Sequence, residues 1–318
     1  MSTYLVTGGA GFIGSHIAET LLKRGDKVRI LDNFVTGKKE NLYFASGFKL
    51  HALGFKLIEG DIRDVKTCQK ACRGVDYVLH QAALRSVPKS VKYPREYNEV
   101  NVGGILNILL AARKEGVKRV VYASSSSVYG DTSIFPEKEN FLPAPISPYA
   151  ASKLAGEYYC QVFSAIYCLE TVSLRYFNVF GPRQSLESQY AVVVPKFITC
   201  LLKDEAPPIH GNGKQSRDFT YIDNVVQANL LAARAKGVGG EVFNIASGKD
   251  YSLLELVNIL NKIVHKRIKP RFISPRPGDV QRTWADISKA KKLLGFSPEI
   301  GFEEGLEKTV TWFRARHK

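Results

Sequence analysis

Short runs of apolar residues recur through the first half of the chain, separated by stretches in which apolar residues repeat every three or four positions. The runs lie at residues 3–8, 27–32, 56–61, 76–82, 119–125 and 172–178, and the helix-like stretches at 16–24, 65–71, 97–115 and 148–165. Short apolar runs are typical of strands buried on both faces of a sheet. Alternating strands and helices predict a parallel sheet with crossover helices on both faces, which is a doubly wound α/β fold.

The second half of the chain is less regular. Helix-like patterns occur near residues 191–202, 222–235, 253–264 and 287–294, and proline-rich connections at 207–208 and 270–277 interrupt them. We therefore expect a smaller C-terminal lobe that packs on the sheet. The expected boundaries are 1–178 for the sheet domain, to which the chain returns within 218–248, and 179–217 and 249–318 for the lobe.

The composition is that of an ordinary globular protein. Of the 318 residues, 45% are hydrophobic and 24% are charged, which argues against global disorder. No stretch approaches the roughly 20 apolar residues of a membrane-spanning helix, and the first residues lack the pattern of a signal peptide. Five cysteines without metal-like spacing predict free thiols, no metal site and a cytoplasmic protein.

The formal net charge of +15 leaves two interpretations open. A basic protein can bind nucleic acid through phosphate contacts, or it can bind small polyanions such as dinucleotides and nucleotide diphosphates. The Lys and Arg residues are scattered, with small clusters at 38–39, 118–119 and 265–267 and no long basic run. We interpret most of this charge as solvated surface and expect no nucleic-acid partner.

A glycine-rich turn follows the first apolar run, with the sequence Gly-Gly-Ala-Gly-Phe-Ile-Gly from Gly8 to Gly14. Glycines between a strand and a helix allow a tight turn and close approach to a pyrophosphate, which the helix N-terminus then binds. Asp32 ends the second strand, 18 residues past Gly14. A carboxylate there accepts hydrogen bonds from the adenosine ribose and repels a 2′-phosphate. The combination predicts a Rossmann domain that binds NAD rather than NADP, although Lys38 lies nearby.

Tyr149 and Lys153 are four residues apart in a helix-like stretch, so they share one helix face. A nearby ammonium and a positively charged nicotinamide both favour tyrosinate, which would lower a tyrosine pKa from its ordinary value near ~10. Such pairs also occur on exposed helices. The serine-rich end of the fifth strand, residues 123–130, adds hydroxyl groups at the sheet edge where ligands bind in these folds. Together these signals indicate hydride chemistry.

At this point the sequence resembles the extended short-chain dehydrogenase/reductase family, and within it the NAD-dependent UDP-N-acetylglucosamine 4-epimerases. The blocks that carry the resemblance run through nearly the whole chain: TGGAGFIGSH, LDNFVTGK, EGDIRD, HQAALRSVP, YASSSSVYG, SPYAASKLAGE, LRYFNVFGPRQ, QSRDFTYIDNV, FNIASG and RPGDVQRTWADISKAKKLLGF. So many blocks in this order make the family highly specific. The resemblance assigns the N-terminal domain to NAD and the C-terminal lobe to a UDP-sugar.

The resemblance implies a role for each matching position. Tyr149 is the expected acid/base, Lys153 holds the nicotinamide ribose, and Ser125 hydrogen-bonds the sugar 4-oxygen. The expected cofactor-binding residues are Gly8, Gly11, Phe12, Ile13, Gly14, Asp32, Asn33, Thr36, Gly37, Asp61, Ile62, Gln81, Ala82, Ala83, Asn101, Tyr149, Lys153 and Tyr176. The expected substrate-binding residues are Arg85, Ser86, Ser125, Ser126, Asn178, Val192, Val193, Arg217, Arg276, Asp279 and Thr283.

The implied reaction is 4-epimerisation through a 4-keto sugar, with transient reduction of bound NAD. Related dehydratases and decarboxylases would carry an acidic residue just before Val128, where this chain has serines, so those reactions rank lower. A UDP-glucuronate 4-epimerase stays open, because Arg85 could bind a sugar carboxylate. A non-catalytic NAD- or RNA-binding protein is the alternative from outside enzymology, and intact Tyr149, Lys153 and Ser125 argue against it.

Substrate size depends on position 283. A bulky tyrosine there excludes N-acetyl groups in the family, whereas Thr283 is small and would admit UDP-N-acetylglucosamine and UDP-N-acetylgalactosamine. Arg85 and Val192 depart from the N-acetyl-preferring pattern, so UDP-glucose and UDP-galactose stay open as further substrates. The helices at 97–115 and 148–165 resemble those of a family dimer interface, and a homodimer is expected.

Overall fold

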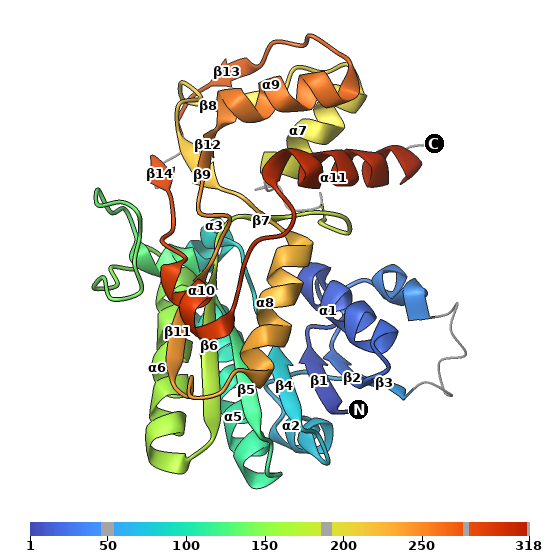
Figure 1. Ribbon diagram of the computed structural model, residues 1–318, viewed down its shortest axis with the longest axis vertical. Helices are drawn as coiled ribbons and strands as arrows, with labels where there is room; N and C mark the ends of the chain where they lie inside the picture. The colour runs from blue at the N-terminus through green and yellow to red at the C-terminus, as the bar shows by residue number, and fades with distance from the viewer. Residues whose placement is uncertain (46–53, 186–192, 276–279, 317–318) are drawn as a thin grey trace.

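The computed structural model describes residues 1–45, 54–185, 193–275 and 280–316. Its lower part in Figure 1 is a seven-stranded parallel sheet with strand order β11-β6-β5-β4-β1-β2-β3. The strands are β1 (Thr3–Thr7), β2 (Lys27–Asp32), β3 (Phe55–Glu59), β4 (Tyr77–His80), β5 (Arg119–Ser125), β6 (Glu170–Tyr176) and β11 (Glu241–Ile245). The doubly wound α/β Rossmann fold expected from the sequence is confirmed. Strand order reverses beside β1, where such sheets bind their ligands.

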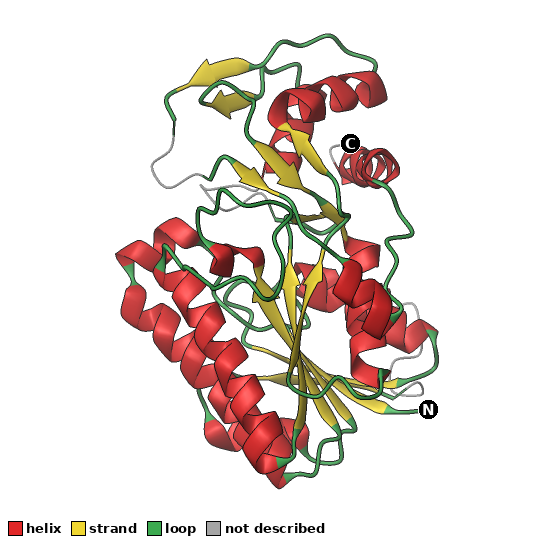
Figure 2. Ribbon diagram, turned by 60° about the vertical axis from the view of Figure 1, so that its left-hand side comes forward, coloured by secondary structure: helices red, strands yellow, loops and turns green. Residues whose placement is uncertain are grey.

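Helices cover both faces of this sheet (Figure 2). One face carries α1 (Phe12–Lys23) and α8 (Ile222–Arg234), and the other carries α2 (Val65–Cys72), α5 (Gly104–Lys114) and α6 (Pro148–Tyr167). The central strands are apolar on both sides because both sides are covered; in β5, every residue before Ser125 is buried. Helix α6 starts where the Ser147 side chain accepts a hydrogen bond from the Ala150 amide, with Pro148 in the first turn.

The second part of the molecule lies at the top of Figure 1 and consists of helices and short strands. Its helices are α7 (Val193–Leu202), α9 (Leu253–Val264) and α11 (Phe302–Arg316), and α10 (Ser288–Leu294) lies beside β11. The strands are β8 (Pro208–His210), β9 (Ser216–Asp218), β12 (Asp250–Ser252), β13 (Arg271–Ile273) and β14 (Arg282–Thr283), with β7 (Val179–Phe180) paired to β10 (Thr220–Tyr221). One apolar core joins the two parts, because it contains Val6 and Leu174 of the sheet as well as Phe197 and Leu306.

The sequence did not predict the short strands of the second part of the molecule, and two helical regions also differ from the expectation. Helix α11 was not expected, although Phe302, Leu306, Val310 and Phe313 recur at helical spacing and are all buried. The single helix expected at 97–115 is instead α4 (Pro94–Tyr97), a π-helical segment (Asn98–Gly103) and then α5.

The described cysteines are all free thiols. Among the described residues, no helix is long and apolar enough to cross a membrane, and no group of three or more His, Cys, Asp or Glu could hold a metal ion.

Candidate active site

The glycine-rich turn joins β1 to α1 in a space that larger residues could not occupy. Gly8 has a φ of +65°, and a Cβ atom on it would lie 2.8 Å from the Ala82 backbone. A Cβ atom on Gly14 would overlap the Gly8 carbonyl oxygen. Gly11 caps α1 without a side chain, so the first amides of the helix stay available to an anion. These features fit a dinucleotide pyrophosphate.

Asp32 at the end of β2 is held in place by the backbone. Its two carboxylate oxygens accept hydrogen bonds from the amides of Ala10 (2.9 Å) and Phe34 (2.8 Å). Burial raises the pKa of this carboxyl, and the two amides oppose that effect. Because a carboxylate has about four acceptor positions, these contacts leave capacity for ribose hydroxyls. The neighbouring Asn33 amide donates to Asp61, which closes the same edge of the site.

A cavity of about 460 Å³ is lined by this turn and by α6. It is lined by most of the residues that the sequence assigned to NAD: Gly8, Gly11, Phe12, Ile13, Gly14, Asp32, Asn33, Thr36, Asp61, Ile62, Gln81, Ala82, Ala83, Tyr149, Lys153 and Tyr176. Gly37 and Asn101 lie behind the lining. A Cβ on Gly37 would touch Asp32, and the Asn101 amide donates to the carbonyl oxygen of Leu84 and to Ser152.

Several residues that line the cavity were not predicted. They include Lys38, Asn41, Arg63, Ser124, Gln184, and three residues of α11: Trp312, Phe313 and Arg316. The C-terminal helix α11 therefore lines the same cavity as the glycine-rich turn that follows β1. No local sequence signal connects these segments, which are separated by nearly the whole chain.

Tyr149 and Lys153 lie on one face of α6, as their spacing predicts. The Lys153 ammonium lies 6.0 Å from the centre of the Tyr149 ring and donates a 2.9 Å hydrogen bond to the Ala123 carbonyl oxygen. Burial lowers the pKa of Lys153 to about 7. Burial also raises the pKa of Tyr149, while a hydrogen bond with Ser125 and the charge of Arg85 act to lower it. Within the protein alone, burial therefore raises the pKa of Tyr149 by more than its neighbours lower it, whereas the sequence predicted a lowered pKa.

The predicted sugar-side residues lie mostly outside the lining of this cavity. Arg85 lines it, whereas Ser86 caps α3 (Val87–Lys92) and Ser126 follows Ser125 in a short 3₁₀ turn. Val193 begins α7. Val192, Arg276 and Asp279 lie outside the described residues.

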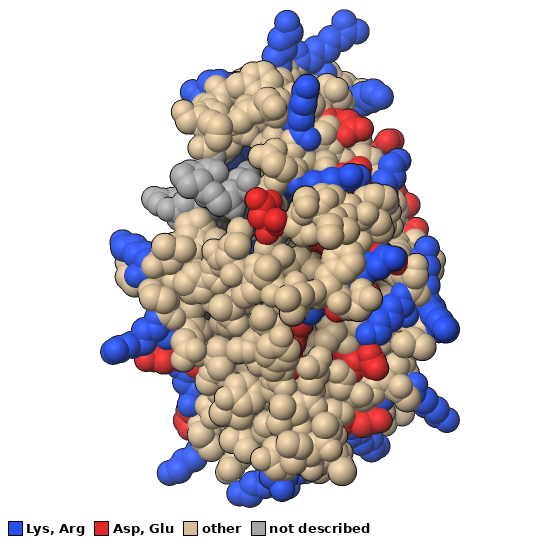
Figure 3. Space-filling model, turned by 90° about the vertical axis from the view of Figure 1, so that its left-hand side faces the viewer, with Lys and Arg blue, Asp and Glu red and all other residues tan. Residues whose placement is uncertain are grey.

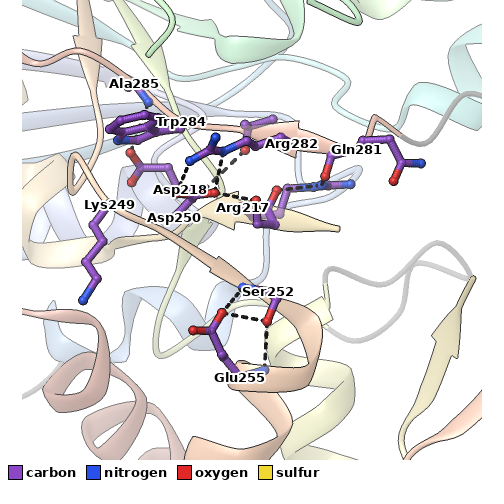
Figure 4. Close-up of polar contacts among 12 residues, drawn as sticks. Arg217, Asp218, Lys249, Asp250, Ser252, Glu255, Gln281, Arg282, Trp284 and Ala285 are labelled. Atoms are coloured by element: carbon purple, nitrogen blue, oxygen red, sulfur yellow. Dashed lines mark hydrogen bonds and ion pairs between the residues drawn. The ribbon is translucent and has the colours of Figure 1, made fainter. Parts of the chain in front are cut away.

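Asn178, Arg217 and Thr283 form a separate group joined by hydrogen bonds. Asn178 has a φ of +32° and donates to the Thr283 hydroxyl (2.9 Å) and to the Asp218 carbonyl oxygen (3.0 Å). Thr283 pairs with Arg217 across strands β14 and β9. The Arg217 guanidinium donates to the carbonyl oxygens of Ser216 and Gln281 (Figure 4).

Asp218 is a buried carboxylate that the sequence analysis missed. It accepts hydrogen bonds from the amide and hydroxyl of Ser247 and from the amides of Gly248 and Ala285, so it joins β9 to the turns after β11 and β14. Burial raises its pKa to about 7. Figure 4 places Asp218 and Ala285 beside the Asp250–Arg282 ion pair, in which the Arg282 Nε atom lies 2.8 Å from the carboxylate. These contacts fix the strands that carry Arg217 and Thr283.

Comparisons with known proteins agree with this geometry. A UDP-N-acetylglucosamine 4-epimerase of Methanobrevibacter ruminantium, solved with UDP-N-acetylmuramic acid, is 41% identical over 99% of both chains, with a TM-score of 0.93. A Thermotoga maritima UDP-glucose 4-epimerase solved with UDP-glucose is 38% identical over 99% of this chain and 100% of that one, with a TM-score of 0.93. A Bacillus cereus UDP-glucuronic acid 4-epimerase solved with its substrate and NAD is 35% identical over 99% of both, with a TM-score of 0.90.

The family comparison covers most of the chain. Residues 4–246 match the NAD dependent epimerase/dehydratase family, and this range contains the glycine-rich turn, Asp32 and the Tyr149/Lys153 pair. The residues of the cavity fit the cofactor that the family uses. The chain therefore belongs to the NAD-dependent epimerase/dehydratase family, the extended short-chain dehydrogenase/reductases.

Proposed function

We propose that the chain, an NAD-dependent UDP-sugar 4-epimerase, interconverts UDP-N-acetylglucosamine and UDP-N-acetylgalactosamine. The observation that carries this proposal is the convergence of Tyr149, Lys153 and the glycine-rich turn on one cavity. The 41% identity to a UDP-N-acetylglucosamine 4-epimerase supports the N-acetylated substrates. UDP-glucose and UDP-galactose are proposed as further substrates, which the small Thr283 side chain would also admit.

The mechanism assigns proton transfer to Tyr149. Bound NAD supplies the acceptor and donor of hydride at C4 of the sugar. Tyr149 removes the proton from the sugar 4-hydroxyl, and Ser125, already hydrogen-bonded to Tyr149, bonds the same oxygen. The Lys153 ammonium favours the tyrosinate that this step needs. Asn178 and Arg217 would hold the UDP diphosphate, so that the 4-keto sugar can turn about it and present the other face of C4 for the return of hydride. Tyr149 would then return the proton to the 4-oxygen.

Thr283 sets the size of the sugar site in this proposal. Its side chain is almost buried, and its hydroxyl accepts the hydrogen bond from Asn178, a residue proposed to hold the diphosphate. A small residue fixed at this point leaves room for a 2-acetamido group beside the diphosphate. The same hydrogen bond links Thr283, which limits the size of the proposed sugar site, to Asn178, which is proposed to hold the diphosphate.

A second substrate, UDP-glucuronate, is favoured by one observation. Arg85 lines the cavity, and its charge acts on the pKa of Tyr149. Among the described residues no carboxylate forms an ion pair with Arg85, so its guanidinium is available to an anionic ligand group. A 6-carboxylate on the sugar would be such a group.

We also propose that the protein is a homodimer through α5 and α6. The face over α6 is largely uncharged in its centre, with Lys and Arg along its edges (Figure 3). Leu110 of α5 and Tyr158, Val162, Ile166 and Tyr167 of α6 are exposed. Such a patch is typical of a protein interface. Light scattering should give twice the chain mass, and Ile166→Glu should give the chain mass while leaving bound NAD in place.

A turnover assay tests the proposed reaction. Purified protein is incubated with UDP-N-acetylglucosamine without added cofactor, and UDP-N-acetylgalactosamine is measured by chromatography, with UDP-glucose, UDP-galactose and UDP-glucuronate in parallel. We expect conversion of the N-acetylated sugar, and Tyr149→Phe should lower the rate by about a thousandfold or more, as expected for loss of an acid/base. Absence of a 4-epimer from every sugar, with NAD bound, would contradict the proposal.

A further inference from the structure

Three successive turns of α6 contact three successive residues at the end of β5. Tyr149 is hydrogen-bonded to Ser125, and Lys153 donates to the carbonyl oxygen of Ala123. One turn further along, Glu157 accepts a hydrogen bond from the Ser124 hydroxyl. The first two contacts belong to the proposed catalytic pair. The third is made by a carboxylate that the proposed mechanism does not use.

Glu157 is a carboxylate in the interior of the protein that pairs with a guanidinium. Its side chain is almost fully buried, and its oxygens accept hydrogen bonds from Nε (2.9 Å) and a terminal nitrogen (2.7 Å) of the Arg175 guanidinium. Arg175 lies on β6 directly opposite Ser124 and stacks over the Tyr129 ring at 4.6 Å. A buried ion pair is weak evidence for stability, because desolvation offsets its attraction. Its position one turn from Lys153 therefore suggests a role in the site.

Among the described residues, one carboxylate acts on the pKa of Lys153. Tyr122 of β5 lies under the ammonium at 5.1 Å, His80 of β4 stacks on Tyr122, and Tyr149 lies one turn back along α6. The imidazole of His80 is buried, which lowers its pKa to about 3, so it is neutral. Burial lowers the pKa of Lys153 to about 7, and Glu157 acts in the opposite direction. Among these neighbours, Glu157 carries the negative charge that favours the ammonium.

We propose that Glu157 is a positioning residue for the catalytic pair: its buried carboxylate keeps Lys153 charged and holds Ser124, and with it Ser125, in place against Tyr149. The inference rests on the roles proposed above for Tyr149, Lys153 and Ser125. Glu157 does not line the cavity, so it acts through Lys153 and β5 rather than on the sugar or the cofactor.

Two substitutions separate the charge of Glu157 from its shape. Glu157→Gln keeps the shape and removes the charge, whereas Glu157→Asp keeps the charge and shortens the side chain. Because Glu157→Gln leaves Arg175 buried without a counter-ion, Glu157→Gln/Arg175→Met removes the carboxylate together with its paired cation, so that no buried charge is left unpaired. The matched control is Glu170→Gln, which breaks the Glu170–Arg119 pair at the other end of the same two strands.

The measurements are kcat and KM across pH, bound NAD and the melting temperature. Loss of the Glu157 charge should move the alkaline limb of kcat to lower pH by roughly one unit, because an opposite charge nearby shifts a pKa by about this much. At pH 8, kcat should fall about tenfold with little change in KM, since one pKa unit changes the ammonium fraction at most about tenfold. In Glu157→Asp and Glu170→Gln, the alkaline limb of kcat should lie at the same pH as in the parent.

Three outcomes would overturn the inference. They are a parental pH profile in both charge-removing variants, an equal shift in Glu170→Gln, or a shift in Glu157→Asp as large as in Glu157→Gln. Tyr149→Phe distinguishes this failure from that of the proposed function. If Tyr149→Phe is inactive and the Glu157 variants behave like the parent, only the inference fails. If Tyr149→Phe keeps parental activity, the proposed function itself fails.

Discussion

The two halves of the proposed active site, a cofactor half and a sugar half, are built in different ways. The cofactor half comes from the carboxyl ends of consecutive parallel strands, where the glycine-rich turn follows β1, Asp32 ends β2 and Gln81 follows β4. The sugar half comes from irregular segments far apart in the chain, and Asn178 and Thr283 meet through a side-chain hydrogen bond across 105 residues. Regular strands thus fix the cofactor half, whereas individual hydrogen bonds such as those of Asp218 fix the sugar half.

This difference has a consequence for substitution. In the cofactor half, the space around the turn limits which side chains are tolerated, because backbone atoms lie against its glycines. In the sugar half, short strands are joined by buried polar groups, and changes in side-chain size or charge can shift them without unfolding the sheet. The three substitutions below test that contrast, in order of decreasing expected effect.

Gly14→Ala should have the largest effect, because it acts where backbone atoms leave no room. The added Cβ would overlap the Gly8 carbonyl oxygen, so the turn must open. Overpacking of this kind costs about 1–3 kcal/mol. If NAD binding bears this cost, its affinity falls by up to roughly a hundredfold. Cofactor released on denaturation, measured by absorbance, should fall below one per chain. Gly103→Ala is the control, since nothing lies within 4 Å of its added Cβ, and it should keep NAD.

Thr283→Tyr should have an intermediate effect, confined to the sugar half. The larger side chain fills the space proposed for the acetamido group and removes the hydroxyl that accepts from Asn178. We expect kcat/KM for UDP-N-acetylglucosamine to fall about tenfold more than that for UDP-glucose, the range that one pocket contact discriminates. Thr283→Val, which loses the hydroxyl without gaining size, should lower both equally. Equal losses in Thr283→Tyr would contradict the size argument.

The same contrast explains what could be predicted from the sequence. The glycine-rich turn, Asp32 and the Tyr149/Lys153 pair are local patterns whose spacing carries their geometry, and the structure brings them to one cavity. The lining residues Trp312 and Arg316 could not be predicted, because their place depends on how α11 packs across the molecule. The existence of helix α11, by contrast, could have been predicted from the helical spacing of its apolar residues.

Asp218 shows a second reason why part of the site could not be predicted from the sequence. Its importance comes from donors at Ser247, Gly248 and Ala285, which lie between 29 and 67 residues away along the chain. A short polar side chain in a strand that the sequence pattern did not predict gives no sign of these partners. Buried polar groups that join irregular segments therefore need the structure, whereas glycines in a strand–turn–helix motif do not.

Glu137→Gln should have the smallest effect on activity and a measurable effect on stability. Glu137 is buried where the loop after β5 meets the segment after β14, and its backbone pairs with Ala285. Among the described residues, its Oε2 atom has no hydrogen-bond partner. Burial, reinforced by the charge of Asp218, raises the pKa of this carboxyl from 4.5 to about 8.

The sign of the pH dependence follows from this shift. Between pH 4.5 and about 8 the folded protein holds a proton on Glu137 that the unfolded chain has lost, so this group lowers the free energy of unfolding as pH rises through that window. Glutamine keeps the shape without the charge. The melting temperature of Glu137→Gln at pH 8 should therefore match or exceed that of the parent. Its fall in melting temperature from pH 5 to pH 8 should be smaller than the fall in the parent. Glu139→Gln, in the same loop, replaces the carboxylate that accepts from the Asn244 amide (2.8 Å) with a weaker, neutral acceptor and should be less stable than the parent at pH 8. A steeper fall in Glu137→Gln than in the parent would mean that Glu137 is charged in the folded protein, and that the sugar half is held together by ion pairing at this position rather than by neutral contacts.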